Sequence, residues 1–118
     1  MALIWQGEVD RITLGENDWA EIKPRMTYGD QQKVTSHYIK LQSRLSKGIT
    51  DADASIELEG GQLALLEANV LAWSLTGKDG QPLPVTKENL RALWPDVAKA
   101  LLDEIGKRNP NYPFAKIG

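Results

Sequence analysis

Residues 63–75 form the most apolar stretch of the chain, interrupted only by Glu67, Asn69 and Ser74. Leucine and alanine dominate this stretch, and it contains neither glycine nor proline. Because both of these residues favour helix, the pattern predicts a helix over residues 61–76. A helix that is apolar on nearly every side has to be covered by its own domain or by a partner chain. We therefore expect this helix to be the centre of the fold.

The second half of the chain predicts a turn and two further helices. Residues 78–84 include two prolines, which cannot continue a helix. Thr86 is a suitable N-cap for a helix over residues 87–94, and Pro95 begins a separate helix over residues 95–106. Apolar residues recur in these helices at helical spacing and predict one core-facing stripe: Leu90, Leu93, Trp94, Val97, Leu101, Leu102 and Ile105.

The N-terminal part predicts a β-hairpin followed by one helix. Polar and apolar residues alternate on either side of a four-residue turn, which is typical of a hairpin over residues 8–23. Thr27 and Asp30 have the spacing of a capping box for a helix over residues 28–46. Residues 49–61 are expected to connect this helix to the apolar one and to be helical only in part. The first helix carries its own apolar stripe of Val34, Tyr38, Leu41 and Leu45.

Together these elements predict a mainly helical α+β fold, in which an N-terminal hairpin packs on about four helices. A length of 118 residues is typical of one domain, so residues 1–118 are expected to form a single unit with an extended tail at residues 107–118. The chain has no cysteine, which excludes disulfides and thiolate metal sites. The N-terminus lacks the pattern of a secretory signal, and the apolar stretch is shorter than the roughly 20 residues that span a bilayer. We expect a cytoplasmic protein without membrane contact.

The charge pattern argues against nucleic-acid and metal partners. The formal net charge is −2, whereas nucleic-acid-binding domains usually carry a basic excess. Asp51, Asp53, Ser55 and Glu57 alternate like the start of a calcium-binding loop. However, residue 56 is an isoleucine where such a loop needs glycine, and residue 62 is a glutamine where it needs glutamate. A solvated acidic loop is therefore expected, with no metal and no cofactor.

Six residues are candidates for binding a partner. Five of them form a basic stripe beside the apolar one in the first predicted helix: Lys33, His37, Lys40, Arg44 and Lys47. Such a stripe is either a solvated helix face or a docking surface for an acidic helix. The sixth candidate, Trp5, lies in an apolar N-terminal segment and either covers the edge of the core or inserts into a neighbour. Trp73 and Trp94 fall on helical stripes and are expected in the core.

No catalytic residue is predicted. His37 is the only histidine, and the spacing of residues in the sequence establishes none of the geometry that a nucleophile and a base would need around it. We expect an open surface around this residue, whereas an enzyme would need a polar pocket there.

The order of the elements resembles that of the tail assembly chaperones of long-tailed phages and prophages. Three segments carry the resemblance: WAEIKPRMTYGD at residues 19–30, AWSLTGKDGQPLPVT at residues 72–86, and the amphipathic residues 90–105. The resemblance implies a non-enzymatic protein of the bacterial host cytoplasm that binds the helical tape measure protein during tail assembly and self-associates. A structural virion component, such as a tail or neck completion protein, is the alternative, and an enzyme acting through His37 is a third possibility.

Overall fold

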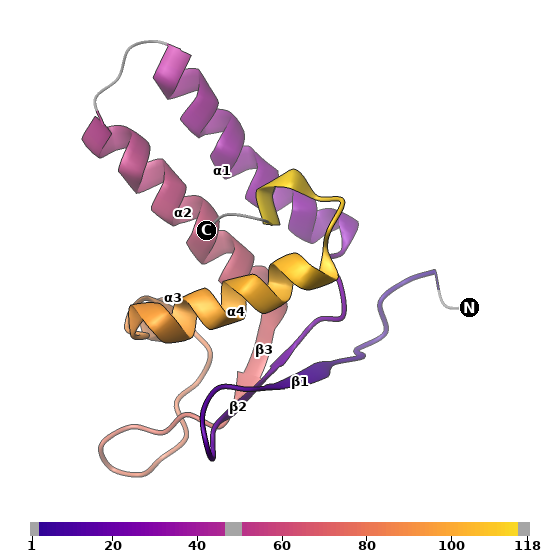
Figure 1. Ribbon diagram of the computed structural model, residues 1–118, viewed down its shortest axis with the longest axis vertical. Coiled ribbons are helices and arrows are strands. Elements are labelled where there is room, and N and C mark those ends of the chain that lie inside the picture. The colour runs from indigo at the N-terminus through magenta and orange to yellow at the C-terminus, as the bar shows by residue number, and fades with distance from the viewer. Residues whose placement is uncertain (1–2, 47–50, 116–118) are drawn as a thin grey trace.

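The fold combines a small antiparallel sheet with two layers of helices (Figure 1). The computed structural model describes the backbone of residues 3–46 and 51–115 and the side chains of residues 3–40 and 60–114. Within these ranges the elements follow one another as β1 (Asp10–Thr13), β2 (Trp19–Ile22), α1 (Tyr28–Ser46), α2 (Asp51–Asn69), β3 (Val70–Trp73), α3 (Lys87–Arg91), α4 (Pro95–Arg108) and the short 3₁₀ helix η1 (Pro113–Ala115). The predicted mainly helical α+β class and the N-terminal hairpin are confirmed.

The sheet has the strand order β1-β2-β3, with both pairs antiparallel. Ala20 of β2 lies opposite Ile12 of β1 and opposite Trp73 of β3. These three side chains are buried, as is Ile22 two residues along the same strand. Since side chains alternate between the two faces of a strand, this face is the one that packs on the helices.

The predicted helix over residues 61–76 is wrong at both ends. The helix α2 begins ten residues earlier, at Asp51, so the predicted connector at residues 49–61 is largely helical. It ends at Asn69, and the following residues form β3. The backbone oxygen of Asn69 accepts a hydrogen bond from the N–H of Lys23 at 3.0 Å, which turns the chain into the sheet. A continuous apolar run fits a buried strand as well as a buried helix, so periodicity alone could not separate the two.

The first two helices form an antiparallel pair (Figure 1), in which two glycines of α2 lie against side chains of α1. A Cβ atom at Gly61 would lie 2.5 Å from Cζ of Tyr38, which is a buried residue of α1. The absence of a side chain at this position therefore leaves the space that the tyrosine ring occupies. The capping box that starts α1 is confirmed, because Thr27 and Asp30 each donate a backbone N–H to the other's side-chain oxygen at 3.1 Å.

The C-terminal part departs from the predicted extended tail. The helix α4 continues to Arg108, and η1 then folds back against α1. The ring of Phe114 stacks on Tyr38 with 4.6 Å between centroids, and Tyr112 packs edge-on against Phe114. Aromatic pairs of this kind add about 0.5–1.5 kcal/mol beyond their burial, which explains why this segment is folded.

The split between α3 and α4 at Pro95 is confirmed, but Trp94 and Val97 of the predicted stripe do not belong to the core. Leu90, Leu101 and Ile105 are buried, whereas the side chain of Trp94 is 77% exposed. Trp94 is the N-cap of α4 and has an extended backbone conformation. The predicted stripe assumed continuous helical spacing through residue 94. Because the backbone is extended there, the spacing is interrupted and the side chain of Trp94 points to solvent.

We expect the stability of this protein to fall at alkaline pH because of Tyr38. Burial raises the pKa of its hydroxyl to about 12, and the hydroxyl has no hydrogen-bond partner. An ordinary tyrosine ionises near pH 10, so the unfolded chain loses this proton first as the pH rises. The unfolded state then binds fewer protons, and the free energy of unfolding falls between about pH 10 and pH 12.

The variant Tyr38→Phe tests this effect in urea unfolding at neutral and alkaline pH. It should be at least as stable as the natural protein near neutrality, because it removes a buried hydroxyl without a partner. Its stability should fall less steeply above about pH 10. Tyr112→Phe is the matched control, since the pKa of Tyr112 is also raised by burial but its hydroxyl is hydrogen bonded to Gln31. If the free energy of unfolding of Tyr38→Phe falls above about pH 10 as steeply as that of the natural protein, the alkaline loss of stability does not come from Tyr38.

Candidate functional site

The structure describes the side chains of three of the five residues in the predicted basic stripe: Lys33, His37 and Lys40. Lys33 and Lys40 are exposed, but His37 is half-buried against α2. A Cβ atom at Gly60 would lie 3.2 Å from Nδ1 of His37, so the expected open surface around this histidine is wrong. The side chains of Arg44 and Lys47 lie outside the described residues. A docking role for the stripe stays a prediction.

A groove of about 1030 Å³ lies at the other end of α1 and brings together three segments that are distant in sequence. These are the N-terminal residues 3–9, which we call the arm, the connector of residues 24–28 between β2 and α1, and the turn of residues 108–112 after α4. We call this hollow the arm groove. Trp5, the sixth predicted residue, is one of its lining residues.

Asn109 holds two walls of the arm groove together. Its Oδ1 accepts a hydrogen bond from the backbone N–H of Met26 at 2.8 Å, and its Nδ2 donates to the backbone oxygen of Ile105 at 2.8 Å. Asn109 is buried, so both bonds are shielded from water. The connector is thereby fixed to the C-terminal end of α4. Nothing in the local sequence pattern pointed to this residue.

The arm is held in a compact turn by its own hydrogen bonds. Nε1 of Trp5 donates to the backbone oxygen of Glu8 at 2.9 Å, and the N–H of Gln6 donates to Oε2 of the same glutamate at 3.0 Å. Gly7 has a φ of 96°, a conformation that residues with a side chain rarely adopt. Nζ of Lys23 lies 4.8 Å from the centroid of the Trp5 ring, a cation–π contact that ties the arm to the sheet.

Exposed apolar side chains are concentrated around the arm groove. Among the described residues eight large hydrophobic side chains are exposed, and five of these belong to the arm or to the groove's rim. Leu3 is 90% exposed, Ile4 76% and Tyr28 78%; Trp5 and Val9 are less so. A gathering of this kind is typical of an interaction surface, whereas singly scattered apolar residues need no explanation.

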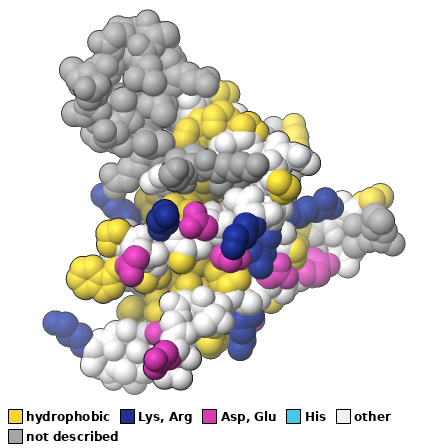
Figure 2. All heavy atoms as spheres, viewed as in Figure 1, with side chains coloured by type: hydrophobic (Ala, Val, Ile, Leu, Met, Phe, Trp, Pro, Cys, Tyr) yellow, Lys and Arg dark blue, Asp and Glu magenta, His cyan; other side chains and the backbone are white. Residues whose placement is uncertain are grey.

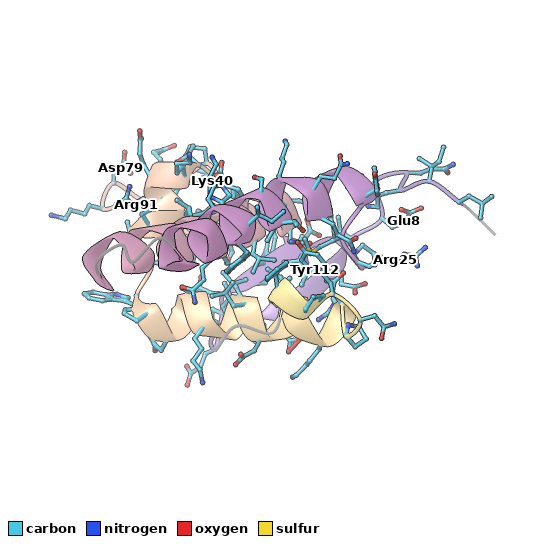
Figure 3. All side chains as sticks on the ribbon, turned by 90° about the horizontal axis from the view of Figure 1, so that it is seen from above. Glu8, Arg25, Lys40, Asp79, Arg91 and Tyr112 are labelled. Carbon is cyan, nitrogen blue, oxygen red and sulfur yellow. The ribbon has the colours of Figure 1, made fainter. Side chains whose placement is uncertain are left out.

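Two charged side chains beside the groove differ in how they are compensated. Arg108 is bonded to Asp10 at 2.8 Å and to Glu104 at 2.7 Å, contacts that raise the pKa of Arg108 and lower the pKa of Glu104. Arg25, in contrast, makes no hydrogen bond or ion pair with any described residue. Figure 3 shows Arg25 and Glu8 at the end of the molecule from which the arm extends. The groove therefore offers an apolar lining with one uncompensated cation.

The rest of the described surface gives no comparable site. Acidic and basic side chains intermingle over α4 on the face shown in Figure 2. Among residues 3–40 and 60–114, no three His, Cys, Asp or Glu side chains are grouped so that they could hold a metal ion. In the part of the chain that the structure describes, every helix is too short or too polar to cross a membrane.

The arm groove is thus the feature best suited to bind a chain segment. No protein-family model, curated protein or solved structure matches this chain. Sequence reasoning identified Trp5 as unusual, but it missed Tyr28, Arg25 and Asn109, which approach Trp5 only through the fold.

Proposed function

We propose that this chain is a non-enzymatic tail assembly chaperone of a long-tailed phage or prophage, acting in the host cytoplasm. In this proposal it binds an apolar helical segment of the tape measure protein in the arm groove until the tail tube forms around it. The observation that carries the proposal is the gathering of exposed apolar side chains around one open groove. The order of elements, which resembles that of such chaperones, gives the client its identity.

The chemistry of the groove suits a helix with one apolar face. Helix-in-groove recognition uses apolar side chains spaced three and four residues apart, which enter an apolar trough. Trp5 and Tyr28 are of the residue types that most often supply the binding energy of such interfaces. Arg25 would pair with a carboxylate beside the apolar face of the client, which fixes the direction of the helix.

The proposal is tested by mixing the full chain with the tape measure fragment encoded beside it and measuring affinity by titration calorimetry. We expect a complex at micromolar concentrations, and we expect Trp5→Ala and Tyr28→Ala each to weaken it about tenfold. Trp94→Ala is the control, because Trp94 is an exposed tryptophan that is not among the residues lining the groove. The double variant Lys33→Glu/Lys40→Glu tests in the same assay whether the predicted α1 stripe contributes.

The absence of a complex, or equal loss of affinity in the Trp94 variant, would contradict this role. Mass spectrometry of purified particles then separates the alternative, since a virion component stays in the particle and a chaperone does not. An excess of this chain in finished particles would favour a tail or neck completion protein.

A further inference from the structure

We infer that, in the absence of a client, the arm groove is filled by the arm of a second copy, so that two copies exchange arms around a two-fold axis. This inference rests on the proposed function only in treating the groove as the client site. It deepens that proposal by giving the site a resting state. The occupant is a defined segment, residues 3–9 of the second copy. Both the geometry of the arm and its charge favour this occupant.

The apolar end of the arm is not packed on the protein's own core. The hydrogen bonds from Trp5 and Gln6 to Glu8 fix the turn, and the cation–π contact with Lys23 anchors it. Beyond this turn Leu3 and Ile4 remain 90% and 76% exposed, although they border an apolar groove. Figure 1 shows the arm leaving the body of the molecule in the direction away from α2. Two adjacent, exposed aliphatic side chains on a fixed turn are suited to enter the groove of another molecule.

The shape of the molecule adds to this argument. Its extents are 46 × 42 × 19 Å and its radius of gyration is 15.2 Å. A compact domain of this length has a radius of gyration of about 13.5 Å. The protein is therefore flatter than a round domain of equal length and exposes more of its surface.

The charges of the surface favour a second copy over a strongly acidic partner. The arm carries Glu8, whose side chain is fully exposed and whose pKa is lowered by hydrogen bonds from backbone N–H groups, above all that of Gln6. The rim of the groove carries Arg25, which has no ion-pair partner among the described residues. In a two-fold pair every contact between the two copies occurs twice. Glu8 of each copy therefore lies against Arg25 of the other, which gives two equivalent ion pairs. The arm and the rim of the groove thus carry one exposed charge of each sign without an ion-pair partner among the described residues, so this surface can complement itself.

Arm exchange would give the site a simple form of regulation. The exposed apolar groups are covered while no client is present, which limits non-specific association. A client segment then has to displace the partner's arm, so client binding and self-association exclude one another. The client's apparent affinity is reduced by the fraction of chain that is dimeric.

The experiment is sedimentation equilibrium of the full chain without client, over concentrations from low to high micromolar. We expect a monomer–dimer equilibrium. The double variant Leu3→Ser/Ile4→Ser should weaken dimerisation about tenfold or more, because it removes the apolar anchors. Trp94→Ser is the matched control, which removes an equally exposed apolar side chain elsewhere and should leave the dimer unchanged.

Charge reversal gives the sharper readout. Glu8→Arg and Arg25→Glu should each weaken dimerisation about tenfold, since each places two like charges together. The double variant Glu8→Arg/Arg25→Glu should recover part of the lost affinity, because the reversed pair is again complementary although the bond from the N–H of Gln6 is absent. A chain that is monomeric at every concentration, a dimer that tolerates the Leu3/Ile4 variant, or a double reversal as weak as the single ones would overturn the inference.

Failure of this inference and failure of the proposed function are distinguishable. The sedimentation experiment contains no client, so it reports on arm exchange alone. A client complex formed by a strictly monomeric chain would overturn only the exchange. A dimer that behaves as described but does not bind the tape measure fragment would overturn only the client.

Discussion

Replacing Trp73 by alanine should lower the free energy of unfolding by about 3–5 kcal/mol, the usual cost of truncating a large buried aromatic side chain. Trp73 is 8% exposed and lies on the edge strand β3, opposite Ala20 of the central strand β2. Its Nε1 donates to the backbone oxygen of Leu83 at 2.7 Å, which ties the turn after β3 to the strand. The truncation therefore leaves a cavity and also removes the partner of that oxygen.

The measurement is urea unfolding followed by circular dichroism, with Trp94→Ala as the matched tryptophan control. Because Trp94 is 77% exposed, its truncation should change the free energy of unfolding by no more than about 0.5 kcal/mol. Trp73→Phe should fall between the two, since it keeps an aromatic ring but loses the donor. Equal destabilisation by both alanine variants would mean that the two tryptophans are not divided between core and surface in this way.

Replacing Asn109 by alanine should cost about 2–3 kcal/mol, because two buried hydrogen bonds are lost and their partners stay buried. The backbone N–H of Met26 and the backbone oxygen of Ile105 would be left without the side chain that now satisfies them. The melting temperature should fall by roughly 4 °C for each kcal/mol. Since this side chain joins two walls of the arm groove, client binding should weaken even where the variant is fully folded.

Asn111→Ala is the matched control for this prediction. Asn111 is two residues away, lines the same groove and is exposed. Its truncation should change stability by no more than about 0.5 kcal/mol. A melting curve of Asn109→Ala that overlies that of the natural protein would show that the connector is held by other contacts.

Local interactions explain which elements the sequence predicted correctly. The capping box of Thr27 and Asp30 joins residues three positions apart, so its signature is complete within one short segment. The same is true of Thr86, whose Oγ1 accepts from the N–H of Asn89 at 3.2 Å, and of Pro95 at the first position of α4. The alternation of the hairpin also requires no distant partner.

Distant partners explain the predictions that were wrong. The transition from α2 to β3 depends on β2, because Val70 takes its strand conformation by pairing with Ile22, nearly fifty residues earlier. The predicted extended tail is folded because Tyr112 and Phe114 contact α1 around Tyr38. Neither partner can be identified from the spacing of apolar residues in one segment.

The arm groove likewise combines features that the sequence predicted with features that depend on contacts between distant segments. The sequence by itself determined the hairpin, the starts of α1, α3 and α4, the apolar character of residues 63–75 and the unusual position of Trp5, because caps, prolines and periodicity act over a few residues. Only the tertiary structure decided that residues 3–9, 24–28 and 108–112 meet, that Asn109 locks them, and that Trp94 faces solvent. These outcomes depend on contacts between segments far apart in the chain, and such contacts override local preference wherever burial favours them.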